Sequence, residues 1–133
     1  MRNHEEVERL ASRFDINPRH FQTLVREALE ELPERFQPML ENVAVVIEEE
    51  PRAEDLEGLD VGPEEGELLG LYHGVPLTDR GAAHSGLPDR VLIFRGPILR
   101  SCTNADEVRK EVRETVIHEI GHHFGLDDEE MVF

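Results

Sequence analysis

Residues 118–122 read H-E-I-G-H, a pattern whose two histidines and glutamate are suited to metal-assisted chemistry. On a helix, residues four apart lie about 40° apart around the axis, so His118 and His122 point the same way. Two imidazoles on one face can share a Zn²⁺ ion. Glu119 lies one step further round, where it can take a proton from a water on the metal instead of binding the metal. The pattern therefore predicts a zinc site with Glu119 as its general base.

The same pattern continues as H-E-x-x-H-x-x-G-x-x-D up to residue 128. Gly125 can adopt the left-handed conformation that ends a helix and turns the chain back. That turn would bring Asp128 to the metal as third ligand, with Asp127 as the alternative. A fourth position would remain for water, as a catalytic site requires. The competing interpretation is a solvated helix end that binds no metal.

A helix long enough to carry this pattern is predicted to begin after Asn104, a suitable N-cap residue. Asp106 and Glu107 would lie in its first turn, where the helix dipole favours acids. Its apolar face is formed at helical spacing by Val112, Val116, Ile120 and Phe124. His123 falls on this apolar side, so we expect a histidine at the edge of the core and not a ligand.

The remaining elements follow from periodicity and from breakers such as proline and glycine. Apolar spacing predicts helices over 4–14 and 18–32, with a short helical turn over 34–40. Apolar and β-branched runs predict strands at 43–47, 68–73 and 91–95. The acidic stretch 48–67 and the polar stretch 78–89 are expected to be loops, and 98–101 a link to the last helix.

Composition limits the classes of function. A length of 133 residues predicts a single domain over 1–133, with 1–17 as an additional N-terminal helix. Thirty acidic against fourteen basic residues give a net charge of −16, which opposes binding to nucleic acids and to anionic membranes. Cys102 is the single cysteine, and neither a signal peptide nor a membrane span is recognisable. We therefore expect a cytoplasmic protein.

The chain also resembles a known family. The segments 68–77 (LLGLYHGVPL), 87–90 (LPDR) and 118–128, in this order, are similar to those of the small bacterial zincin-like metallopeptidases, or minimal zincins. The resemblance spans residues 18–128. It implies an α+β fold, with a small mixed sheet packed on helices and the H-E-x-x-H helix near the C-terminus. It also implies zinc-dependent hydrolysis of a peptide or protein substrate, while leaving the oligomeric state open.

The H-x-x-x-H-x-x-G-x-x-D spacing is similar to that of the metzincins too. Their third ligand, at the position of Asp128, is usually histidine, and their Met-turn has only Met131 as a substitute here. In zincins an edge strand above the helix pairs with the substrate backbone, and we expect Val91–Arg95 to be that strand. Tyr72 could stabilise an oxyanion, but an aromatic side chain packed in the core is the favoured interpretation.

Three functions are compatible with these observations. An active metallopeptidase comes first. A module that binds metal without turnover comes second, and an interaction protein whose acidic surface binds a basic partner comes third. Metal content separates the third from the others, and peptide turnover separates the first from the second.

Overall fold

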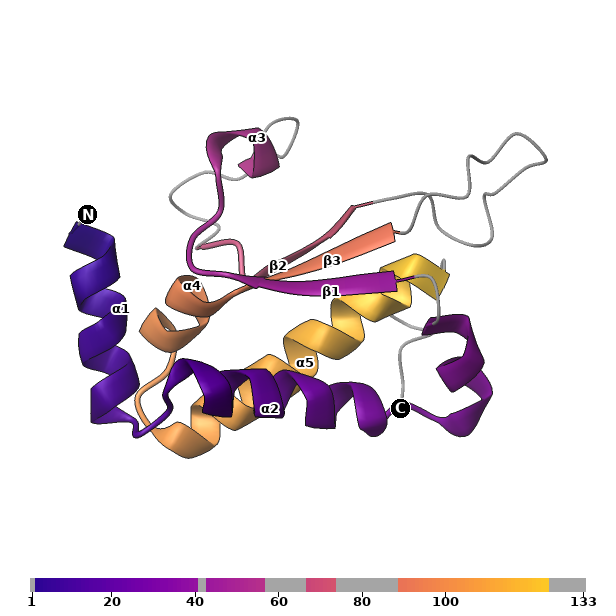
Figure 1. The fold of residues 1–133 in the computed structure, drawn as a ribbon, viewed down its shortest axis with the longest axis horizontal. Helices are drawn as coiled ribbons and strands as arrows, with labels where there is room; N and C mark the ends of the chain where they lie inside the picture. The colour runs from indigo at the N-terminus through magenta and orange to yellow at the C-terminus, as the bar shows by residue number, and fades with distance from the viewer. Residues whose placement is uncertain (1, 41–42, 57–66, 74–88, 125–133) are drawn as a thin grey trace.

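The computed structural model describes residues 2–40, 43–56, 67–73 and 89–124 (Figure 1). The elements, in chain order, are α1 (Arg2–Arg13), α2 (Pro18–Glu30), the 3₁₀ helix η1 (Glu34–Leu40), β1 (Val43–Glu48), α3 (Ala53–Leu56), β2 (Gly70–His73), β3 (Asp89–Phe94), α4 (Arg95–Arg100) and α5 (Ala105–Phe124). Helices α2 and α5 lie on one side of a small mixed sheet and the short α3 lies on the other, which gives the α+β arrangement that the sequence predicts (Figure 1).

The three strands form one sheet in the order β1-β3-β2. β1 runs parallel to β3, with Val43 opposite Asp89, and β2 runs antiparallel to it, with Gly70 opposite Ile93. The expectation that residues 91–95 form an open edge is therefore wrong, because β3 is paired on both sides. The uninterrupted apolar run reflects the burial of both faces of β3, which by itself leaves the pairing at its two edges open. Among the described residues, β2 is paired only with β3.

Helix α5 has the N-terminus that the sequence predicts. The Asn104 side-chain oxygen accepts a hydrogen bond from the backbone N–H of Glu107 at 2.9 Å. The Glu107 carboxylate in turn accepts hydrogen bonds from the backbone N–H and hydroxyl of Thr103, at 2.7 and 2.9 Å. These bonds pair donors that a helix start otherwise leaves unsatisfied.

The apolar face of α5 is fully buried. Val108, Val112, Val116 and Ile120 are each 0% exposed and belong to one core cluster with β3 and the two N-terminal helices. Helix α5 packs against β2, β3 and α2. The predicted helical face is thereby confirmed at Val112, Val116 and Ile120, whereas the side chain of Phe124 is not among those described. This face directs the opposite side of the helix away from the core.

Helix α4 was not predicted. The glycine and proline at 96 and 97 end the strand as expected, but they lie in the first turn of a helix instead of opening a plain link. Proline is tolerated there because first-turn N–H groups have no partner within the helix. The acidic stretch after β1 likewise contains the short helix α3, and Glu48 extends β1.

The N-terminal helix α1 is part of the core and also makes ion pairs. Val7, Ala11 and Phe14 pack in the same cluster as α4 and α5. Arg95 of α4, 9% exposed at its side chain, lies 2.8 Å from Glu8 and 3.1 Å from Glu49. No described helix is long and apolar enough to cross a membrane.

We expect Asn104→Ala to lower the free energy of unfolding by about 1 kcal/mol, within the 0.5–2 kcal/mol typical of a lost N-cap. Urea denaturation measures this loss. Asn104→Asp is the control, because aspartate also accepts a hydrogen bond at the cap and should retain most of the stability. An alanine variant as stable as the aspartate variant would show that the cap bond contributes nothing.

Candidate metal centre

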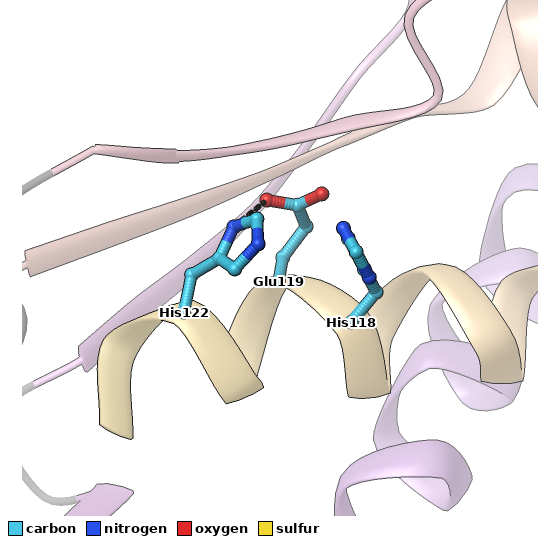
Figure 2. A group of neighbouring side chains, drawn as sticks. All are labelled: His118, Glu119 and His122. Atoms are coloured by element: carbon cyan, nitrogen blue, oxygen red, sulfur yellow. Dashed lines mark ion pairs between the residues drawn. The ribbon is translucent and has the colours of Figure 1, made fainter. Parts of the chain in front are cut away.

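His118, Glu119 and His122 come together on α5. Their ligand atoms all lie within 4.8 Å of one another, and the two imidazole centroids are 4.5 Å apart. Figure 2 shows the three side chains rising from one side of the helix toward the sheet, with the Glu119 carboxylate between the two rings. Two imidazoles and a carboxylate are ligands that zinc accepts. The residues present therefore fit a metal ion, and the helical spacing expected for the histidine pair is confirmed.

Glu119 is the most buried of the three, with an exposed fraction of 8%. Burial raises the pKa of its carboxyl above the usual value, while His118 and a hydrogen bond from the backbone N–H of Tyr72 act in the opposite direction. One of its oxygens lies 3.4 Å from Nδ1 of His122. A carboxylate whose pKa is shifted upward is a better proton acceptor near neutral pH, which is the property of a general base.

The Tyr72 N–H reaches Glu119 because it points away from the sheet. The N–H of Phe94 donates to the carbonyl of Leu69 at 2.9 Å, which makes residues 69 and 94 a hydrogen-bonded pair. In an antiparallel ladder such pairs alternate, so Gly70 and Tyr72 direct their backbone groups to the other side of β2. Glu119 therefore lies at the edge of β2 that no described strand covers.

Gly70 permits the close approach of β2 to α5. A Cβ atom at this position would lie 2.7 Å from Cγ2 of Thr115 and 3.0 Å from Cγ of Glu119. The first distance is shorter than real Cβ atoms show and the second is tighter than most, so a larger residue would push the strand away from Glu119. The predicted strand 68–73 included Gly70 but not this role, although a lone glycine in a strand is a signal of close backbone approach.

Tyr72 and Asp89 form a pair that the sequence did not predict. The Tyr72 hydroxyl donates to Oδ2 of Asp89 at 2.5 Å, and Asp89 is 3% exposed. The ring of Tyr72 packs against the core. These contacts agree with the interpretation of Tyr72 as a packed aromatic residue, with its hydroxyl proton already bound by Asp89.

Several predicted residues lie outside the described part of the chain. They are Gly125, Asp127, Asp128 and Met131, and with them the third ligand. His123 belongs to α5, but its side chain is not among those described. Cys102 is buried before α5, and burial raises the pKa of its thiol.

A second set of metal-binding side chains consists of His4, Glu8 and Glu49. Both of these glutamates bind the guanidinium of Arg95, whose positive charge opposes a cation in the same place. Among the ion pairs of the described residues, none brings an arginine side chain to His118, Glu119 or His122. This group on α5 is therefore the stronger candidate for a metal site.

We expect Gly70→Ala to lower the free energy of unfolding by roughly 1–3 kcal/mol, the usual cost of overpacking. Adding Thr115→Ser removes the Cγ2 methyl group that the new side chain meets. The double variant should therefore recover part of the loss, a coupling that a double-mutant cycle in urea denaturation measures. Strictly additive effects of the two substitutions would contradict the proposed contact.

Comparisons with known proteins identify the family of the chain. The model of a family described as zincin-like metallopeptidase matches residues 40–132, which include the whole sheet and α5. A solved structure of a conserved hypothetical protein from Thermo thermophilus is 27% identical, with a TM-score of 0.55, and the match covers 82% of this chain and 94% of that one. No curated protein matches. The family match and the H-E-x-x-H helix at a sheet edge together place this chain in the zincin-like metallopeptidase family.

Proposed function

We propose that the protein is a zinc-dependent metallopeptidase in which His118, His122 and Asp128 hold the metal. The observation that carries this proposal is the meeting of His118, Glu119 and His122 beside the edge of β2 that no described strand covers. Membership of the zincin-like family supports it independently. The cytoplasmic location and the zinc ion itself belong to the same proposal.

The substrate is an extended peptide that adds to β2. Gly70, with its N–H and carbonyl, and Tyr72, with its carbonyl, face the edge of this strand that no described strand covers, and these are the groups that a peptide strand can pair with. We therefore assign to β2 the role of pairing with the substrate that was predicted for residues 91–95. A peptide placed there passes directly over Glu119, because the carboxylate already accepts the N–H of Tyr72.

Catalysis divides between the metal and the chain's own groups. A zinc ion held by the histidines supplies Lewis-acid chemistry, making a water more acidic and polarising a carbonyl. Glu119 accepts the proton of the attacking water and passes it to the leaving amine as the C–N bond breaks. The Tyr72 N–H orients the carboxylate, and burial keeps its basicity high. Each proton taken from water is returned to the amine product, so Glu119 ends as it began.

One observation favours a second function, a metal-binding module without turnover. The carboxylate of Glu119 lies close enough to both imidazoles to be a metal ligand itself. In that arrangement Glu119 would not be available as a base, and the site would be structural. The two functions differ in what Glu119 does, which makes it the residue to test.

We expect the purified protein to contain a single zinc ion per chain, and His118→Ala or His122→Ala to remove most of it. Asp128→Ala should lower the zinc content as well, whereas Asp127→Ala should retain it. Elemental analysis of the dialysed proteins measures this. If Asp127→Ala loses zinc and Asp128→Ala keeps it, the third ligand is Asp127 and not Asp128.

We expect Glu119→Gln to retain zinc and to lower peptide hydrolysis by about 10²-fold or more, the usual contribution of a general base. Glutamine keeps the size of the side chain but cannot accept the proton. The wild-type reference must lose its activity to a chelator and regain it with zinc. If Glu119→Gln loses zinc, Glu119 is a ligand and the structural-metal function is supported; wild-type turnover in the variant would refute the mechanism.

A further inference from the structure

A cavity of about 330 Å³ opens beside the metal centre, between β2 and α5. Residues 67–70 line one wall, and five α5 residues between Glu111 and Glu119 line the other. Its volume lies at the lower end of the range for ligand sites and has room for a single long side chain. The proposed function assigns it no role.

The cavity extends from the metal centre toward the start of α5. His118 and Glu119 border it, and Glu114 and Glu111 precede His118 by four and seven residues. At about 1.5 Å per residue these glutamates lie roughly 6 and 10 Å further along the axis. An extended peptide advances about 3.3 Å per residue. A side chain entering the cavity therefore belongs to a residue within about three positions of the scissile bond.

The walls of the cavity are unevenly charged. Glu67 is held by Arg100 at 2.6 Å, and Glu114 has Lys110 at 4.0 Å on the exposed surface. Glu111 is half-buried and has no ion pair with any described residue. Glu111 and Glu114 are three apart on one helix face, where like charges repel each other. A cation between them would relieve that repulsion.

Apolar atoms complete the site. Leu68 and Leu69 are half-buried in the wall that faces these glutamates. Lysine and arginine place an aliphatic stem against apolar surface while their charged end stays near water or acids. The net charge of −16 also draws cationic peptides toward the molecule.

We propose that this cavity is a subsite for a lysine or arginine side chain of the peptide substrate. Glu111 and Glu114 bind the positively charged end of that side chain. The proposal rests on the proposed function, because it takes the peptide along β2 as given. It makes the enzyme selective for basic peptides, with the basic residue close to the cleaved bond.

The test compares two fluorescently labelled polyalanine peptides. They differ only at the central residue, which is lysine in one peptide and norleucine in the other. Norleucine keeps the aliphatic stem and lacks the ammonium group. Binding is measured by fluorescence anisotropy on zinc-loaded Glu119→Gln protein, in which slow hydrolysis does not interfere. We expect the lysine peptide to bind about tenfold more tightly, as a charge-assisted contact would give. Glu111→Gln with Glu114→Gln should bring the ratio close to one.

The matched control removes two negative charges elsewhere. Glu30→Gln with Glu54→Gln changes exposed residues of α2 and α3, outside the cavity, and should leave the ratio unchanged. Equal binding of the two peptides, or an equal loss in the control, would overturn the subsite. The kcat/KM values of the wild-type protein for the lysine and norleucine peptides separate the two proposals. Hydrolysis without a preference for lysine refutes the subsite alone. Preferential binding of the lysine peptide without hydrolysis refutes the peptidase alone.

Discussion

The close packing of β2 on α5 at Gly70 is the contact on which the site depends. Without a side chain at this position, the strand approaches until Cγ2 of Thr115 and Cγ of Glu119 lie only 2.7 and 3.0 Å from where a Cβ atom would be. That approach buries Glu119, raises the pKa of its carboxyl and brings it within reach of the Tyr72 N–H. The same packing leaves His118 and His122 partly exposed on the adjoining side of the helix. One short contact thus distinguishes the buried Glu119 from the two histidines, which are more exposed.

Helix α5 can hold this geometry because its other side is anchored. Its start is capped by Asn104, and four of its apolar side chains are completely buried between the sheet and α2. A site built on a rigid element keeps its side chains closer to a working arrangement than one built on loops. Helical spacing alone brings the two histidines together, whereas the position of Glu119 depends on β2 as well.

Part of the acidic surplus forms an organised network around two arginines of α4. Arg100 binds Glu6, Glu50 and Glu67, and so connects α1 and the turn after β1 to the residues that lead into β2. Partly buried ion pairs add little net stability, because desolvation offsets their attraction. Their effect is to define how segments far apart in the sequence meet. Glu67 is the member that reaches both this network and the cavity beside the metal centre.

The sequence by itself determined the local features: the start and apolar face of α5, the histidine pair, and the α+β class. Capping residues and helical periodicity act within a few residues, so a single sequence reveals them. Tertiary structure decided the central place of β3, the helix α4 and the Tyr72–Asp89 pair, because these depend on partners far along the chain. Asp128 as third ligand stays a prediction, since residues 125–133 are outside those described. The strand beside the base could not be chosen from sequence, because the apolar run of 91–95 is equally compatible with an edge or a centre until its pairing is known.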